Sequence, residues 1–467
     1  MVKGNERYIP IKRMYDMKYF LMILFTGFTL NAGPLEVKIE STHKHLSKDT
    51  SIPTYYVVKV KGKKSDAVKA PLNIALLIDR SKSMDSQKLQ QLKLAAEEFI
   101  KQLNKSDRLA IISYASNVRI EMTSRLMSDK SEAYKVIKGI KAKGSSALFA
   151  GMSKAHGEIK KAAKGQALNR IIILSASNAD TGPRSSSELI SLAKSFADEN
   201  ISISTIAIGK SFNPYAMNGI SAKASGNYYN ADIPAKLPAI LSNELMDLKN
   251  AVASKIKVSI NVSDKLSGFK VLNKESKIEG ADVFTNYSQI YNEQNREIIF
   301  QLKAPASTKE GKIKAFSVNI EYLNPINGKY QKMVIDHNIE IKAAKAGVNK
   351  KVMEQVIDYL NTFDDETAVW NNNIGNTKNA VEALNRKGKR LSDYGQYYSS
   401  PSKLKTQVDN NKKNIDQLQK GVRWSYKEQN EILQKINTIR SQQRALDQEF
   451  KRAFRKQKTQ NSRNTKK

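Results

Sequence analysis

The chain has 467 residues, which is too long for a single hydrophobic core, so two or three domains are expected. Its 78 Lys and Arg outnumber its 45 Asp and Glu, and the formal net charge of +33 favours anionic partners. Because this charge is spread along the chain, it favours general adhesion to polyanionic surfaces over one dedicated nucleic-acid groove. The chain has no cysteine, which excludes disulfide scaffolds, thiolate zinc sites and cysteine nucleophiles.

Residues 1–33 are typical of a secretory signal peptide. Lys18 precedes an apolar run over residues 19–30, and the small residue Ala32 follows at a candidate cleavage point. Met17 would be a more usual start, so the residues before it could be an upstream extension. The alternative is a short membrane anchor, although the run is shorter than the roughly 18 apolar residues that span a bilayer. We therefore predict export to the periplasm, the cell surface or the medium, with cleavage favoured over retention.

Residues 34–69 are polar and basic, and they are predicted to form a linker with one strand at 55–60. Beyond them, short apolar runs alternate with amphipathic helices, the pattern of βαβ units and of a doubly wound, mostly parallel sheet. The predicted strands cover 72–78, 108–113, 170–175 and 201–208, and the predicted helices cover 86–103, 131–140, 150–163, 185–198 and 234–248. An α/β domain is therefore expected over residues 70–249.

The hydrophobic period changes to two from Lys255 onward. Ile256, Val258 and Ile260 alternate with polar residues, which is typical of a half-buried strand. An Asn-Gly pair at 327–328, between two strand-like runs, indicates a hairpin turn. A small antiparallel β-sandwich is expected over residues 252–343.

The remainder, residues 346–450, is predicted to be helical. Runs at 348–362 and 376–391 could form a helical hairpin, and a heptad pattern begins at Leu404 with ten of its fourteen a and d positions apolar. This pattern predicts a coiled coil over 404–450 that could join copies of the chain, weakened at its centre by Gly421. The alternative is an amphipathic helix packed on the chain's own domains.

The last 17 residues, 451–467, contain eight Lys and Arg and no acid. Such a run is typical of a solvated, disordered tail, and it could bind polyanions electrostatically.

A buried apolar run at 74–78 is followed directly by Asp79, Ser81 and Ser83. Five consecutive apolar residues indicate a strand covered on both faces, and open α/β sheets bind ligands at the carboxyl ends of their strands. One carboxylate and two hydroxyls at alternate positions are hard oxygen ligands suited to Mg²⁺, which keeps several of its waters. The run therefore suggests a divalent-metal site in this loop.

The same run resembles the D-x-S-x-S metal-ion-dependent adhesion site of von Willebrand factor A (VWA) domains. Residues 143–152 resemble the family's Gly-x-Thr loop, with Ser146 at the position of the ligating Thr, and residues 201–209 and 225–229 resemble later strands of the family. The resemblance implies a VWA or Rossmann-like fold. It also implies a Mg²⁺ or Mn²⁺ site with one position open to a partner's acidic residue, formed by Asp79, Ser81, Ser83 and Ser146.

The sequence departs from the family pattern in a third loop. Where the family has Leu-x-Asp-Gly, this chain has Ala176 or Ser177 at the Asp position, and neither supplies a carboxylate. Arg80 and Lys82 place cations beside the expected metal, and each would oppose Mg²⁺ by roughly 1–2 kcal/mol. Asp180 could compensate for the lost acid. Two interpretations remain: a working metal site, or a degenerate one whose hydroxyls cap the loops and whose cations meet an acidic partner directly.

No motif in the sequence assembles a nucleophile with a base, so an enzyme is not expected. We predict an exported adhesion or scaffold protein that docks a protein partner, one that carries an acidic residue, through the loops at the top of its sheet. The alternative is a structural envelope protein attached to an anionic polymer or membrane by its basic C-terminal helices, with the α/β domain as a packing module.

Overall fold

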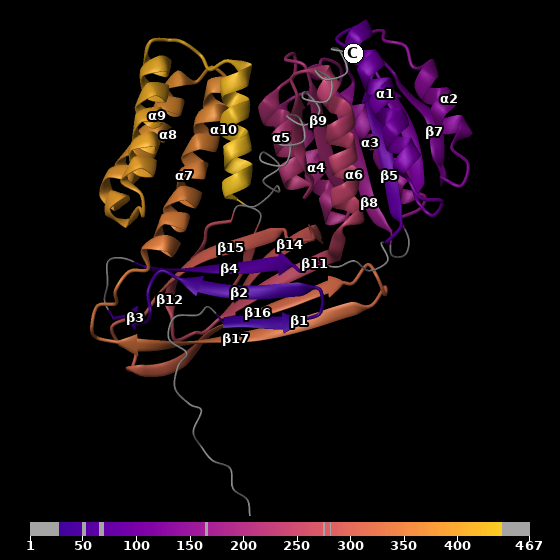
Figure 1. The fold of residues 1–467 in the computed structure, drawn as a ribbon. Helices are drawn as coiled ribbons and strands as arrows, with labels where there is room; N and C mark the ends of the chain where they lie inside the picture. Colours follow the sequence, from indigo (N-terminus) through magenta and orange to yellow (C-terminus); the bar gives the residue numbers. More distant parts are fainter. Residues whose placement is uncertain are drawn as a thin grey trace, which may run out of the picture.

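The computed structural model describes residues 28–48, 53–64, 70–163, 167–273, 276–280 and 282–440. An α/β domain and a helical bundle stand side by side above a β-sandwich (Figure 1). Most of the predicted signal segment and the basic tail lie outside the described residues. Within the described part of the chain, no helix is long and apolar enough to cross a membrane.

The α/β domain is built on a six-stranded sheet with the strand order β10-β9-β8-β5-β6-β7. Every neighbouring pair is parallel except β6 and β7. The chain winds outward in one direction from β5 and in the other from β8, so the order reverses between these two strands. The strands are β5 (Leu72–Asp79), β6 (Arg108–Tyr114), β7 (Val118–Leu126), β8 (Leu168–Ser175), β9 (Ser202–Ile208) and β10 (Tyr228–Ala231).

Helices cover both faces of this sheet, and each face has its own apolar core. Side chains of α1, α2 and α6 fill one core, and those of α3, α4 and α5 fill the other. The helices are α1 (Ser86–Gln102), α2 (Ser131–Gly139), α3 (Leu148–Lys160), α4 (Ser186–Asp198), α5 (Pro214–Lys223) and α6 (Leu237–Lys249), the last preceded by a 3₁₀ turn at Pro234–Lys236. The doubly wound domain expected from the sequence is confirmed in its architecture, although β7 and α5 were not predicted.

The β-sandwich contains more of the chain than the sequence predicted. One sheet has the order β1-β2-β4-β15-β12 and the other β13-β14-β11-β16-β17-β3, with a shared apolar core between them. Its strands are β1 (Phe28–Ala32), β2 (Leu35–Ser41), β3 (Leu46–Ser47), β4 (Thr54–Gly62), β11 (Ala251–Val262), β12 (Ser267–Val271), β13 (Lys277–Glu279), β14 (Asp282–Tyr291), β15 (Asn295–Lys303), β16 (Gly311–Leu323) and β17 (Tyr330–Lys342).

The linker predicted over residues 34–69 is therefore wrong in part: the strand expected at 55–60 lies within β4, but β2 and β3 were not predicted. Leu35, Val37 and Ile39 alternate with polar residues and are buried in the sandwich core, while β4 pairs along its length with β15. The high lysine content hid this pattern, because the lysines occupy the opposite face of each strand. The edge strand β1 falls inside the predicted signal segment, so cleavage after Ala32 would remove it.

Four helices form the bundle, and they are α7 (Lys350–Asn373), α8 (Thr377–Tyr394), α9 (Pro401–Gln419) and α10 (Tyr426–Ile439), with a 3₁₀ turn at Gly395–Tyr397. The coiled coil predicted from Leu404 is not continuous over the described residues. Gly421 has a positive φ of 73°, and the chain turns there between α9 and α10. Because α9 packs on α8, and α10 on α7 and α5, the apolar heptad positions of these helices are buried or partly buried inside the molecule, whereas Val422 between them is exposed.

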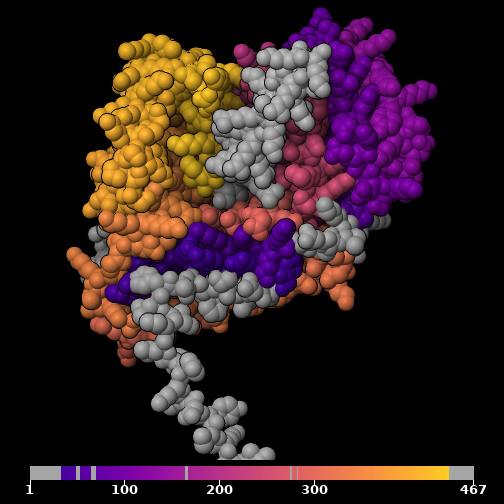
Figure 2. Space-filling view, viewed as in Figure 1, coloured from indigo at the N-terminus to yellow at the C-terminus, as the bar shows by residue number. Residues whose placement is uncertain are grey.

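Figure 2 shows the bundle and the α/β domain beside each other on the sandwich, and α10 and α7 of the bundle contact α5 of the α/β domain. The sandwich sheet that contains β4 and β15 contacts α7 with one of its faces, where Val57 and Ile299 pack on Val352 and Val356. This sheet is therefore covered on both sides, by the second sheet and by the bundle.

Candidate functional site

The predicted site residues gather at the carboxyl edge of the central sheet, where the strand order reverses. Asp79 ends β5, Ser175 ends β8 beside it, and Ser146 precedes α3. In doubly wound folds this reversal opens a crevice between the loops that leave the two strands. The sequence predicted this position for Asp79, because it follows from which strand the acid terminates.

Asp79 is fully buried, and its carboxylate is held by the surrounding loops. The backbone N–H of Ser81 donates to Oδ1 at 2.8 Å. Oδ2 accepts from the N–H of Ala176 at 3.0 Å and from the hydroxyl of Ser177 at 2.6 Å, with the Ser175 hydroxyl farther away at 3.4 Å. Ala176 and Ser177, which replace the expected acid, thus donate to Asp79 where an acid would repel it.

Two backbone hydrogen bonds join the loop after β5 to the loop before α3. The N–H of Lys82 donates to the carbonyl of Gly144 at 2.9 Å, and the N–H of Lys143 donates to the carbonyl of Arg80 at 2.7 Å. Gly144 has a φ of +91°, and a Cβ there would lie 2.6 Å from the hydroxyl of Ser116. This close approach requires glycine, and it fixes the position of the hydroxyl loop that follows.

Ser146 has a buried hydroxyl with no hydrogen-bond partner among the described residues. Its backbone N–H donates to Oδ1 of Asp180 at 2.5 Å, and its carbonyl accepts from the N–H of Asp180 at 3.0 Å. Asp180 therefore lies at the rim of the site, as the sequence suggested, but its carboxylate is already engaged in closing the loop. Buried hydroxyls without partners normally mark a place for a water or an ion.

Tyr114 is a buried member of the site that the sequence analysis missed. It ends β6, and its hydroxyl lies beside those of Ser146 and Ser175 without the geometry of a hydrogen bond. Burial, followed by the negative charge of Asp79, raises the pKa of Tyr114 well above its usual range. The neutral phenol is therefore maintained at the base of the crevice. Its position at the end of the strand next to β5 was the available signal.

The structure corrects the predicted role of Arg80. Its side chain turns inward and is only 4% exposed, with Nε donating to the Ser113 hydroxyl at 3.1 Å and Nη2 to Asn117. Burial, followed by repulsion from Arg119, lowers the pKa of the Arg80 guanidinium. Arg80 is thus a structural group of the β6–β7 edge and is not available to meet an acidic partner.

Lysines still surround the rim of the site. Lys82 is exposed on the loop, and Lys88 reaches back from α1 to donate to the carbonyl of Ser83 at 2.9 Å while pairing with Asp85 at 2.8 Å. Ser83 is half-buried beneath this contact. The rim therefore carries lysines together with the carboxylates of Asp85 and Asp180, above the buried carboxylate of Asp79.

The donor set was tested for its fit to a divalent cation. Among the described residues, Asp79 Oδ1 accepts only from the N–H of Ser81, and the hydroxyl of Ser146 has no hydrogen-bond partner; Ser81 is buried beside Asp79. No group of three or more His, Cys, Asp or Glu side chains occurs among the described residues. The residues therefore fit a weak site with one carboxylate and hydroxyl ligands, of the kind that Mg²⁺ occupies while retaining waters.

The fold and this loop constellation define a doubly wound domain with a buried polar cluster at the topological switch point. Residues 73–243 match the model of the von Willebrand factor type A domain, so this part of the chain is a VWA domain. The resemblance predicted from Asp79, Ser81 and Ser83 is confirmed at the level of the domain.

Two bacterial proteins are similar to this part of the chain. Uncharacterized protein YfbK of Escherichia coli is 28% identical over 205 residues, which is 44% of this chain and 36% of that protein. Uncharacterized protein sll0103 of Synechocystis is 27% identical over 168 residues, or 36% of this chain and 39% of that protein. The chain thus aligns with little more than a third of the length of each.

Solved structures resemble a larger part of the chain. A von Willebrand factor type A protein from Catenulispora acidiphila has a TM-score of 0.64 at 13% identity, covering 90% of this chain and all of that one. The ArnB paralog VWA2 from Sulfolobus acidocaldarius has a TM-score of 0.56 at 15% identity, with 88% and 99% coverage. The similarity in fold therefore extends beyond the VWA domain.

Proposed function

We propose that the protein is an exported, non-enzymatic docking or scaffold protein whose VWA domain binds a protein partner through the loops at the top of its sheet. The observation that carries this proposal is the buried cluster around Asp79, in which hydrogen bonds hold three loops of the sheet top in place. Preformed surfaces bind with a smaller ordering cost than mobile ones. The exposed Lys82 on the loop after β5 favours an acidic group on that partner.

The chemistry of the crevice supports a binding role over catalysis. Its hydroxyls belong to Ser81, Ser146, Ser175, Ser177 and Tyr114, and none of them hydrogen-bonds to a histidine or lysine in the described structure. A serine nucleophile needs such a base within hydrogen-bond reach.

Docking is tested by placing a photo-crosslinking amino acid at Lys82 in the exported, full-length protein. A matched control carries the same group at the exposed Arg125 of β7. Arg125 pairs with Leu109 near the start of β6, so it lies near the end of the domain opposite to Lys82. We expect a discrete crosslinked protein from position 82 that position 125 does not give. Equal crosslinking from both positions, or none from position 82, would reject docking at the sheet top and leave attachment through the C-terminal helices as the better explanation.

Metal use is a separate part of the proposal. Asp79, Ser81, Ser83 and Ser146 would hold Mg²⁺ or Mn²⁺, which when bound would supply a Lewis-acidic position for a partner's carboxylate. Ser146 gives the sharper test, because its hydroxyl has no partner in the described structure and its loss should leave the fold intact.

Calorimetric titration with Mg²⁺ and Mn²⁺ should therefore show binding to the wild-type protein that Ser146→Ala weakens about tenfold. Ser131→Ala, on the exposed first turn of α2, should leave it unchanged. No heat in the wild-type protein would remove the metal from the proposal, and the crosslinking result would still decide whether the sheet top binds a partner.

A further inference from the structure

A groove follows one face of α4, away from the sheet-top crevice. Two cavities, of about 290 and 180 Å³, lie along this face and share Lys194 and Lys223 as lining residues. Ser187 lines the first cavity and Asp198 the second, a separation of 11 residues along α4, or about 16 Å of helix. The cavities therefore form neighbouring parts of one elongated site.

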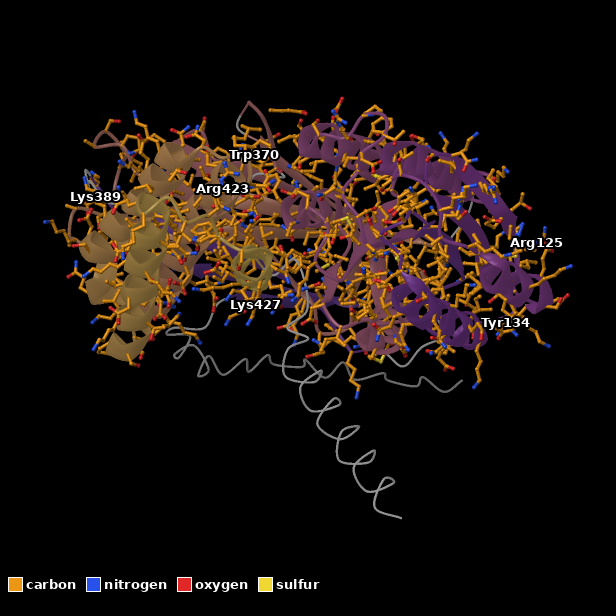
Figure 3. The ribbon with its side chains drawn as sticks, turned by 90° about the horizontal axis from the view of Figure 1, so that it is seen from above. Arg125, Tyr134, Trp370, Lys389, Arg423 and Lys427 are labelled. Atoms are coloured by element: carbon orange, nitrogen blue, oxygen red, sulfur yellow. The ribbon has the colours of Figure 1, made fainter. Side chains whose placement is uncertain are left out.

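All three parts of the molecule contribute walls to this groove. Trp370 of α7 closes the first cavity against Tyr215 of α5, with ring centroids 4.7 Å apart and a 39° tilt. Phe284 and Tyr287 of the sandwich strand β14 line the second cavity. Figure 3 shows Trp370 where the bundle meets the α/β domain. Because Trp370 is only half-buried, part of its indole remains available to a ligand.

The charge of the groove is positive. Lys194, Lys223, Lys277 and Arg296 line it, and Asp198 is the single carboxylate among the lining residues. Lys194 pairs with Asp198 at 2.7 Å. Lys223 and Lys277 are exposed and have no ion pair within the described part of the chain.

The remaining lining decides between classes of anionic ligand. Peptide-binding grooves depend on apolar pockets that take anchor side chains. Here the aliphatic lining residues are Ile190, Ala197 and Ala222, and the rest of the uncharged lining consists of aromatic rings, serines and asparagines. This lining is complementary to a sugar chain, whose rings present hydroxyls at their edges and apolar C–H groups on their faces. The wall hydroxyls and amides can hydrogen-bond to the sugar hydroxyls, the indole face at one end can cover a ring, and the lysines can pair with sugar carboxylates.

We propose that this groove binds an acidic polysaccharide, with a sugar ring covering the exposed part of Trp370 and its carboxylates paired with Lys223 and Lys277. This site is independent of the sheet-top docking surface, so either can exist without the other. It would give a defined location to the adhesion that the net charge of the chain predicts.

The test measures binding of a galacturonate oligosaccharide to the full-length protein by calorimetry and by tryptophan fluorescence. The chain has two tryptophans, and Trp424 is only 3% exposed, so a change on binding would report on Trp370. We expect binding that Lys223→Gln and Lys277→Gln each weaken about five- to tenfold. The matched control is Lys389→Gln, which removes the same charge from an exposed position on the far side of the bundle (Figure 3). It should leave affinity unchanged.

Several results would overturn the proposal. Equal binding of the methyl-esterified oligosaccharide would show that charge is not recognised, and an equal loss in Lys389→Gln would show adhesion by net charge alone. Tighter binding of poly-glutamate, in competition with the sugar, would make the groove a peptide site. Trp370→Phe keeps an aromatic face and should retain affinity while losing the fluorescence change; loss of affinity in this conservative variant would contradict stacking.

Discussion

Replacing Asp79 with alanine should destabilise the VWA domain even when no metal is present. The carboxylate is fully buried and accepts from two backbone N–H groups, those of Ser81 and Ala176, and from the hydroxyl of Ser177. The hydroxyl can rotate toward another acceptor, but the two N–H groups cannot. A buried donor left unpaired costs about 1–3 kcal/mol, so two of them cost about 2–6 kcal/mol.

Removing a buried anion recovers part of that cost, since a buried charge is itself unfavourable. The free energy of unfolding is therefore expected to fall by about 2–4 kcal/mol in Asp79→Ala. It should fall by roughly half as much in Asp79→Asn, in which one amide oxygen can still accept while the NH₂ group faces a donor.

The measurement is calorimetric unfolding in EDTA, so that loss of a bound cation contributes nothing. Ser146→Ala is the matched variant, because it removes from the same cluster a hydroxyl that has no hydrogen-bond partner among the described residues. It should unfold within about 0.5 kcal/mol of the wild-type protein. Unchanged or increased stability of Asp79→Ala in EDTA would refute this reasoning. It would mean that the carboxylate is a repelled charge awaiting a metal, not the hydrogen-bonded centre of the loops.

Three further predictions concern parts of the molecule that support the site. Burial lowers the pKa of His337 to about 4, so the folded sandwich favours neutral imidazole, and stability is lost as pH falls below the unfolded pKa of 6.5 toward 4. Between about pH 8 and pH 5 this loss should be about 2 kcal/mol in urea unfolding, and an identical acid sensitivity in His337→Phe would contradict it. Arg170→Met should lower the free energy of unfolding by about 3–5 kcal/mol, because it leaves the Glu244 carboxylate buried without its cation. Calorimetry would detect this loss as unfolding of the VWA domain at a lower temperature. A stability equal to that of the wild-type protein would show that the Arg170–Glu244 ion pair is dispensable. Gly226→Ala would place a Cβ 1.9 Å from a backbone carbonyl of β9, and it should destabilise the protein by about 1–3 kcal/mol. Gly157→Ala, in open space on α3, should instead stabilise the protein by about 0.5–1 kcal/mol. If chemical denaturation gave both changes in stability the same sign, the close approach at Gly226 would be rejected.

The location of the candidate site could be predicted from sequence because it depends on strand ends. The apolar run before Asp79 identified a central strand, and the switch-point rule then fixed where its acid lies. The direction of a side chain within that site could not be predicted in the same way. Arg80 follows Asp79 directly, and its inward course depends on Ser113 and Asn117, which belong to other strands. Sequence spacing contains no information about such partners.

The sandwich shows a different reason for failure. Its core strands β2 and β4 come from the segment before the VWA domain, and β15 comes from the segment after it, so the sandwich is assembled from two distant parts of the chain. Alternation in 35–41 was visible but short, and lysines on the outer face gave the segment the composition of a linker. Arg170 then joins the two domains, donating to Ser204 within the VWA domain and to Gln289 of β14, both at 2.8 Å. A domain inserted in this way is tied at both of its chain ends to the sandwich below it.

The polar face of α10 explains why the coiled-coil prediction failed and what the helix does instead. The heptad pattern depends on the apolar a and d positions, but α10 contacts the VWA domain through Tyr426 and through two asparagines, each one position after an a position. Asn430 accepts from the buried hydroxyl of Tyr228 at 2.7 Å, and Asn437 donates to Asn218 at 2.6 Å. These asparagines are seven residues apart, so they lie on one stripe of the helix. A buried polar group needs a hydrogen-bond partner, so Asn430 and Asn437 specify one orientation of the bundle on α5 and β10. That orientation brings Trp370 to the end of the groove along α4.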